Sequence, residues 1–127
     1  EAFAVLQRRF RDWYAWTVNL PGSYYLDAIE RLFRRNELAR GGFVALGKRI
    51  DLACLRTPLY LLAARDDELV APAQLFALAH LTGAVPAEIH TALAPCGHLG
   101  LFMGRNVLRE HWPGVAQWLG ESDGGRR

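Results

Sequence analysis

The stretch "LYLLAARDDELVAPAQLFALAHLTGAVPAEIHTALAPCGH", residues 59–98, decides the fold. It begins with an unbroken apolar run, Leu59 to Ala64, which is typical of a buried strand. A polar loop follows, and Pro72 marks the start of a helix that ends before Gly83. Residues 88–93 alternate in polarity and predict a second strand. Strand, helix and strand in this order form a βαβ unit, so we expect two parallel strands with the helix packed on one face.

The size and composition of the chain fit one ordinary folded domain. It has 127 residues, of which 51% are hydrophobic and 22% charged, enough for one core and too few for two. The net charge is only +2, and the basic residues are scattered in pairs, which argues against nucleic acid as a partner. The longest apolar run is far shorter than the roughly 20 residues that cross a bilayer, so we expect no transmembrane segment.

The cysteines and the start of the chain indicate a reducing compartment. Cys54 and Cys96 are the only cysteines, and neither belongs to a C-x-x-C pair, so we predict no disulfide framework, no metal site and no cofactor. No signal segment precedes the first predicted helix. We therefore expect a cytoplasmic protein.

The residues before the decisive stretch predict two amphipathic helices and a hairpin. Apolar residues recur every three or four positions over residues 2–14 and again over residues 24–35, which indicates two helices. The "NLPG" segment at residues 19–22 separates them, and Ser23 is expected to cap the second. A small hairpin or loop is predicted over residues 43–50, with its turn at Gly47 and Lys48.

Two shorter elements complete the expected secondary structure. A helical turn is predicted over residues 51–55. The last helix lies in "NVLREHWPGVAQWL", residues 106–119, and is expected to be interrupted or restarted at Pro113. Its inward-facing residues should be Val115, Trp118 and Leu119.

Two loops follow the expected parallel strands, and both carry side chains suited to acid–base chemistry. Asp66 and Asp67 come after the first strand, and Cys96 and His98 come after the second. Carboxyl ends of adjacent parallel strands meet at one edge of a sheet, so the loops should converge. We therefore expect the carboxylate of Asp67 beside the imidazole of His98, where it would fix the ring tautomer and stabilise the imidazolium.

The acid and the histidine are two thirds of a catalytic triad in the chain order nucleophile, acid, histidine. The only serines are Ser23 and Ser122, and neither lies in a G-x-S-x-G setting. Cys54 lacks the flanking glycines of a nucleophile elbow, and Cys96 is only two residues from His98. We therefore expect the nucleophile to lie outside these 127 residues.

Each candidate residue also has a structural interpretation. His98 could serve as a hydrogen-bonded residue in a loop corner. Asp66 is expected to cap the following turn. Asp67 begins the D-x-x-V-x-P pattern and is therefore the better candidate for the acid. Cys96 is expected to be a small buried residue. Three other histidines are predicted to be structural: His80, His90 and His111.

An aromatic group near the amino terminus is expected to belong to the core. Its members are Trp13, Tyr14, Trp16, Tyr24 and Tyr25. The alternative is that some of them line an apolar acyl pocket. The candidate substrate-binding residues are then Trp16, Tyr24, Tyr25 and Leu99.

Four segments resemble one known family of enzymes. They are "NLPGSYYLDAIERLFRRNELARGGFVALGKRIDL" (19–52), "TPLYLLAARDDELVAP" (57–72), "PCGHLGLFMGR" (95–105) and "HWPGVAQWL" (111–119). They look like the C-terminal half of the α/β-hydrolases of polyhydroxyalkanoate metabolism, the synthases and the intracellular depolymerases. The first segment is closer to the synthases and the third to the depolymerases.

The resemblance implies a fold and a division of the chain. The fold would be α/β, the C-terminal portion of an α/β-hydrolase with lid helices, the last βαβ unit, a terminal helix and an incomplete sheet. Residues 1–57 would be lid helices and a connecting hairpin, and residues 58–120 the C-terminal part of the core. Residues 121–127 are expected to be a disordered tail, because they are polar and glycine-rich. Without the remaining strands the chain is expected to be marginally stable.

The resemblance also implies a function for the parent protein. Asp67 would be the triad acid and His98 the triad base of an enzyme acting on hydroxyacyl esters or polyesters, with a polymer granule surface as a further partner. Hydrolysis, as in a depolymerase, is the preferred reaction. The alternatives are a synthase-like acyltransferase with a Cys nucleophile and a non-catalytic granule-binding or assembly module. Without a nucleophile or an oxyanion hole, this segment alone is expected to be inactive.

Overall fold

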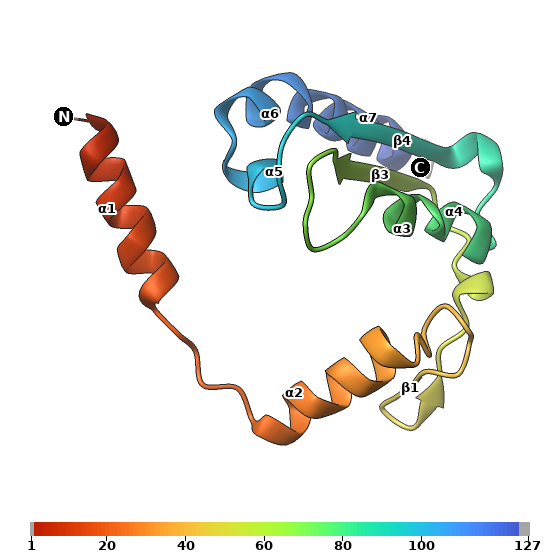
Figure 1. Ribbon diagram of the computed structural model, residues 1–127. Helices are drawn as coiled ribbons and strands as arrows, with labels where there is room; N and C mark the ends of the chain where they lie inside the picture. The colour runs from red at the N-terminus through yellow and green to blue at the C-terminus, as the bar shows by residue number, and fades with distance from the viewer. Residues whose placement is uncertain (1, 125–127) are drawn as a thin grey trace. The chain divides into compact units, whose positions relative to one another are not determined.

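The computed structural model describes residues 2–124, which form two compact units (Figure 1). The first unit reaches Glu37 and the second starts at Leu38. The hairpin region of residues 38–57 therefore clusters with the second unit, whereas the predicted division between lid and core falls after residue 57. That functional division stays a prediction.

The first unit consists of helices. Helix α1 covers Ala2–Ala15, and α2, Gly22–Ala28, continues into a π-helical segment, Ile29–Arg34. The "NLPG" segment separates α1 from α2, as predicted. Two arginines of the π segment form ion pairs with acids four residues earlier: Arg31 lies 3.5 Å from Asp27 of α2, and Arg34 lies 2.9 Å from Glu30. Such pairs stabilise a helix by a few tenths of a kcal/mol each, about 0.2–0.5.

Two predictions for the first unit are wrong. Pro21 is the residue that precedes α2, no side chain caps the helix, and Ser23 lies inside it. The aromatic side chains expected in the core are exposed, from 50% for Trp13 to 81% for Trp16. An amphipathic pattern predicts a helix with an apolar face, but it does not determine which part of the protein covers that face.

The second unit begins with a small hairpin. Strands β1, Val44–Ala45, and β2, Lys48–Arg49, pair antiparallel. Leu46 and Gly47 form the turn with φ of 50° and 73°, one position earlier than predicted. A 3-10 turn, Leu52–Cys54, follows where a helical turn was expected, and the Asp51 carboxylate caps it by accepting from the Ala53 N–H.

The predicted βαβ unit is confirmed. Strands β3, Leu59–Ala64, and β4, Ile89–Ala94, are parallel, with Leu59 opposite Ile89 and Ala64 opposite Ala94. The connection contains α3, Pro72–Phe76, α4, Leu78–Leu81, and a 3-10 turn, Pro86–Glu88. The described residues thus form a partial α/β domain in which the two sheets have two strands each.

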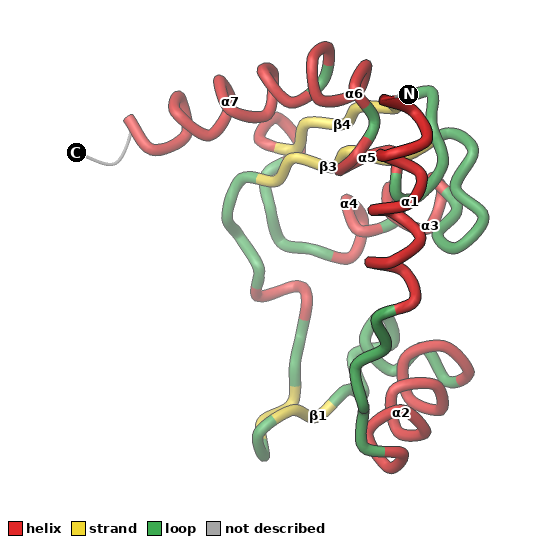
Figure 2. Tube along the Cα trace, turned by 90° about the vertical axis from the view of Figure 1, so that its left-hand side faces the viewer, coloured by secondary structure: helices red, strands yellow, loops and turns green. Residues whose placement is uncertain are grey.

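Three helices follow β4. They are α5, Gly100–Met103, α6, Arg105–Glu110, and α7, Trp112–Gly124. The predicted restart near Pro113 is confirmed, since α6 ends at Glu110 and α7 begins at Trp112. Pro113 thus lies in the first turn of α7, where a helix accommodates proline. Helix α7 continues past Gly120 to Gly124, and the rest of the predicted tail, residues 125–127, lies outside the described residues. Figures 1 and 2 show α7 on one side of the β3–β4 pair and α3 with α4 on the other.

The core lies where the ends of the strands meet the last helices. Its central cluster consists of small and medium side chains: Ala64, Ala94, Leu101 and Val107. Leu62, Cys96 and Trp112 pack against it, and the Trp112 indole N–H donates to the Leu101 carbonyl at 2.7 Å. Alanines at the strand ends let α5 and α6 approach closely. Of the three residues expected to face inward from α7, Val115 and Trp118 are half-buried, whereas Leu119 is 56% exposed, so the prediction is wrong for Leu119.

No helix within residues 2–124 is both long and apolar enough to cross a membrane.

Candidate active site

The candidate site lies in the two loops that follow β3 and β4. The main-chain ladder continues beyond the strands, since the Arg65 N–H donates to the Ala94 carbonyl at 2.8 Å and the Asp66 N–H to the Cys96 carbonyl at 3.0 Å. These bonds tie the loop of Asp67 to the turn of His98. Both strands end on the same side in Figure 1, so the loops meet there.

The Asp67 and His98 side chains are hydrogen-bonded to each other. Oδ2 of Asp67 lies 2.8 Å from Nδ1 of His98. The Asp67 side chain is almost fully covered, at 4% exposure, whereas that of His98 is 40% exposed. The expected proximity of acid and imidazole is therefore confirmed, and part of the His98 side chain is open to solvent.

The second carboxylate oxygen of Asp67 is held by the main chain. Oδ1 accepts from the N–H groups of Leu69 at 2.8 Å and Val70 at 2.9 Å. These bonds lower the pKa of Asp67, with the Val70 N–H contributing most. Burial opposes the shift, and the His98 ring adds to it. Asp67 is consequently ionised at neutral pH.

The turn after β3 corrects one prediction. Asp67, and not Asp66, accepts the capping bonds of this turn. The same residue therefore fixes the loop with one oxygen and orients His98 with the other. The signal was present in the D-x-x-V spacing, because an aspartate that caps a turn bonds to N–H groups two and three residues ahead.

The arrangement suits general acid–base chemistry. An ionised carboxylate is an acceptor only, so the proton on Nδ1 of His98 must point at Asp67. The other ring nitrogen, Nε2, is then the basic one and can accept a proton from a nucleophile. Of the side chains that the structure describes, Asp67 is the one hydrogen-bonded to His98.

The two cysteines are not placed as partners of His98. Cys54 is exposed, with its sulfur 3.9 Å from Oδ2 of Asp51. Cys96 is half-buried against the core cluster, and burial, together with the nearby charges of Asp66 and Asp67, raises the pKa of its thiol. A raised pKa keeps sulfur in the less nucleophilic thiol form.

The predicted substrate-binding residues belong to both units. Trp16, Tyr24 and Tyr25 lie in the first unit and are exposed. Leu99 follows His98 in the second unit and is 38% exposed. Their role in substrate binding stays a prediction.

The other histidines lie away from the Asp67 carboxylate. His80 lies in the last turn of α4, and His90 on β4 packs its ring 4.5 Å from that of Tyr60. His111 lies between α6 and α7, where its N–H donates to the Val107 carbonyl at 2.9 Å. Within residues 2–124 no group of three or more His, Cys, Asp or Glu side chains is arranged to hold a metal ion.

The structure also contains an apolar pocket that sequence analysis missed. It has a volume of about 230 Å³ and is lined by Tyr60, Leu61, Leu62, Leu75, Leu101, Phe102, Trp112 and Val115. Three consecutive residues of β3 contribute and none of β4, so the pocket lies along the edge of β3 that faces away from β4. Its lining comes from four separate elements, and no local sequence pattern could have revealed it.

The chain is similar to one protein family and to several curated proteins. A family model described as "PHB de-polymerase C-terminus" matches residues 3–123. Similar curated proteins include three named "Poly(3-hydroxyalkanoate) polymerase subunit PhaC". That of Haloferax mediterranei is 26% identical over 95% of this chain and 24% of its own length. Those of Synechocystis and Allochromatium vinosum are each 29% identical over 89% of this chain, and over 30% and 31% of their own lengths.

The chain thus spans 24–31% of the length of these relatives. No solved structure matches it significantly.

Proposed function

This chain belongs to the PHB de-polymerase C-terminus family, and from that premise we propose that Asp67 and His98 are the acid and the base of an acyl-transfer site in an α/β-hydrolase that acts on hydroxyalkanoate esters. Family membership also confirms the resemblance seen in the sequence. The observation that carries the proposal is the 2.8 Å hydrogen bond between Oδ2 of Asp67 and Nδ1 of His98. The histidine acts from the exposed end of its ring, and the carboxylate keeps that ring oriented.

Acyl transfer at this site runs in two half-reactions. Nε2 of His98 takes the proton of the nucleophile, which forms a bond to the acyl carbonyl carbon. The bond from that carbon to the leaving group then breaks, and the leaving group takes the proton from Nε2. In the second half-reaction His98 activates a hydroxyl or water that attacks the acyl-enzyme, and the proton returns to the nucleophile. Asp67 stabilises the imidazolium in both.

We favour polymerisation over hydrolysis. The preference for hydrolysis rested on the "GHLGLFMGR" ending, but the relatives reported above carry the name of a polymerase subunit. A growing polyester hydroxyl would then attack the acyl-enzyme, and the nucleophile would be a cysteine. Depolymerisation remains the second candidate, because the matching family model is described by it.

The nucleophile and the oxyanion hole are proposed to lie in polypeptide outside these 127 residues. Two observations support this. The chain spans only 24–31% of the length of the three relatives. Within the described residues β3 pairs with β4 alone, so its other edge is available for further strands of a hydrolase core. Residues 1–57 are proposed as the lid, with a polyester granule in the cytoplasm as the surface on which the enzyme works.

The sequence on the amino-terminal side of Glu1 tests the proposal. A G-x-C-x-G segment after a strand supports polymerisation, and a G-x-S-x-G segment supports hydrolysis. The complete protein should then consume a hydroxyacyl thioester or release hydroxy acid from polyester. A reading frame with neither segment, or a complete protein inactive on both substrates, contradicts acyl transfer and favours a non-catalytic granule-binding module.

A further inference from the structure

The turn that carries His98 is packed tightly between the residues on either side of it. Cys96 lies two positions before His98 and Gly100 two positions after, where α5 begins. A Cβ atom added at Gly100 would lie 2.7 Å from Cβ of Cys96 and 3.2 Å from its sulfur. Carbon atoms of real side chains do not approach to 2.7 Å, so position 100 accepts only glycine while Cys96 stays in place.

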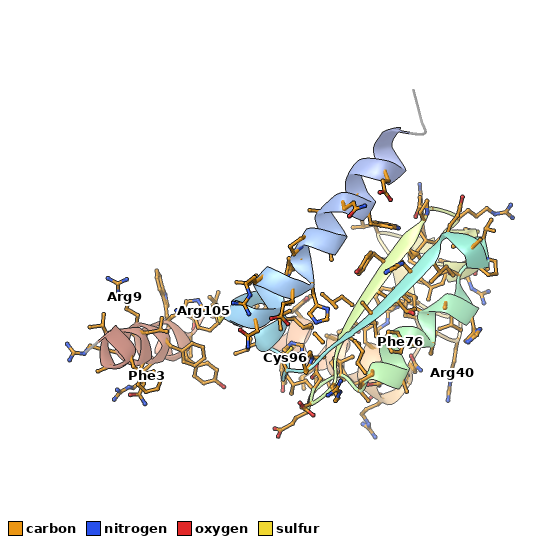
Figure 3. All side chains as sticks on the ribbon, turned by 90° about the horizontal axis from the view of Figure 1, so that it is seen from above. Phe3, Arg9, Arg40, Phe76, Cys96 and Arg105 are labelled. Carbon is orange, nitrogen blue, oxygen red and sulfur yellow. The ribbon has the colours of Figure 1, made fainter. Side chains whose placement is uncertain are left out.

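Neither neighbour of this contact can move freely. Cys96, which is labelled in Figure 3, packs against the core cluster at the ends of the strands, and its carbonyl accepts the N–H of Asp66 at 3.0 Å. The carbonyl of Gly100 accepts the N–H of Gly104 at 2.9 Å, and a Cβ at position 104 would lie 2.5 Å from that oxygen. Gly100 is thus confined between Cys96 on one side and Gly104 on the other.

His98 lies at the midpoint of this confined segment. The turn is closed by the Gly100 N–H donating to the Gly97 carbonyl at 2.9 Å and the Leu101 N–H donating to the His98 carbonyl at 3.3 Å. Because His98 lies between Cys96 and Gly100 in the chain, a displacement of either residue should also displace the backbone of His98. The same shift alters the 2.8 Å contact between the ring and Asp67.

We propose that Cys96 and Gly100 are a positioning pair, whose close packing sets the backbone of His98 so that its ring meets Asp67. The inference rests on the proposed acid–base role of His98, but it concerns the hydrogen bond itself. It also gives Cys96 a role that needs no thiol chemistry, since the atom that would lie nearest to a Cβ added at position 100 is the Cβ of Cys96.

The test measures the hydrogen bond in the complete protein by NMR. In Gly100→Ala, the proton on Nδ1 of His98 should exchange with solvent roughly 2- to 10-fold faster, the fold-change that matches the net contribution of one hydrogen bond. Gly120→Ala is the matched control, because a Cβ at Gly120 of α7 meets nothing within 4 Å. It should leave the exchange rate unchanged.

Second-site changes at Cys96 separate positioning from a general loss of structure. Cys96→Gly removes the opposing Cβ and should restore the wild-type exchange rate in the Gly100→Ala background. Cys96→Ala keeps the Cβ and should not restore it. If Gly100→Ala alone does not fold, the Cys96→Gly double variant should fold and show the wild-type rate.

Three results would overturn the inference. They are an unchanged exchange rate in Gly100→Ala, equal rescue by Cys96→Ala and Cys96→Gly, and a Cys96→Gly double variant that neither folds nor recovers the wild-type rate. An inactive complete protein with the predicted exchange behaviour would refute the proposed function and leave the positioning pair intact.

Discussion

Both carboxylate oxygens of Asp67 are hydrogen-bonded, and only one of them contacts His98. Oδ2 contacts Nδ1 of His98 at 2.8 Å, while Oδ1 accepts two main-chain N–H groups from its own loop. The main-chain bonds therefore orient the carboxylate independently of its contact with the ring. This arrangement determines which nitrogen of His98 carries a proton and which is available for chemistry.

Asp67→Asn should remove most of the activity of the complete protein. Asparagine can donate as well as accept, so it no longer fixes the ring in the tautomer with Nε2 as the base. We expect a loss in kcat on the order of 10⁴-fold, as for the same change in a Ser-His-Asp triad. Asp66→Asn is the control, because the Asp66 contact to the other loop is made by its main-chain N–H. Equal losses in the two variants would show that the acid is misassigned.

Asp67 should also contribute stability that depends on pH. Its pKa is lowered in the folded chain relative to the ordinary 3.8, so the unfolded chain binds the proton more readily. The contribution is present above the unfolded pKa and is lost as the pH falls below about 4 toward the folded value. The difference in melting temperature between wild type and Asp67→Asn should therefore narrow under acid conditions. A difference that stays constant from neutral pH down to acid unfolding would contradict the hydrogen-bond account of Asp67.

Leu46→Asn should stabilise the hairpin. Leu46 lies in the left-handed region with φ of 50°, followed by Gly47 with φ of 73°, which is the pairing that favours Asn-Gly in a two-residue turn. The gain should be about 1 kcal/mol in the free energy of unfolding, measured by urea denaturation. Leu55→Asn is the matched control, because Leu55 has φ of −77°. An unchanged free energy of unfolding in Leu46→Asn, or an equal increase in Leu55→Asn, would refute the explanation.

Cys96 should react slowly with alkylating reagents. Burial and two neighbouring carboxylates raise its pKa, so less thiolate is present at neutral pH. Cys54 is exposed and serves as the internal comparison. Mass spectrometry of iodoacetamide-treated protein should show Cys54 modified several-fold faster. Faster modification of Cys96 would reopen it as a candidate nucleophile.

The βαβ unit and the acid–histidine contact were predictable because they depend on local patterns. The apolar run from Leu59 to Ala64, Pro72 and the alternation before Ala94 fix the order strand, helix, strand. Two parallel strands that are neighbours in the sheet end at the same edge, so the loops that follow them lie together. The position of His98 beside Asp67 follows from this. The i,i+4 ion pairs of the second helix were predictable for the same reason.

The features that sequence analysis missed depend on contacts between distant elements. The pattern of α1 predicts an apolar face, but it does not predict which part of the protein packs on that face. Trp16, just after α1, was expected in the core and is exposed. The capping role went to Asp66 because two adjacent aspartates look alike in sequence, and only the loop conformation distinguishes them. The close approach of Gly100 to Cys96 depends on where α5 begins, a helix too short to leave a periodic signal.

The most direct test of the central claim compares two histidines in the complete protein. His98→Gln should reduce the rate of acyl transfer from a hydroxyacyl thioester by about 10²–10⁴-fold, because the general base is lost. His90→Gln, on β4, should stay near the wild-type rate, since His90 packs on Tyr60 and not at the Asp67 carboxylate. A His98→Gln protein as active as His90→Gln would contradict the acid–base role of the Asp67–His98 pair.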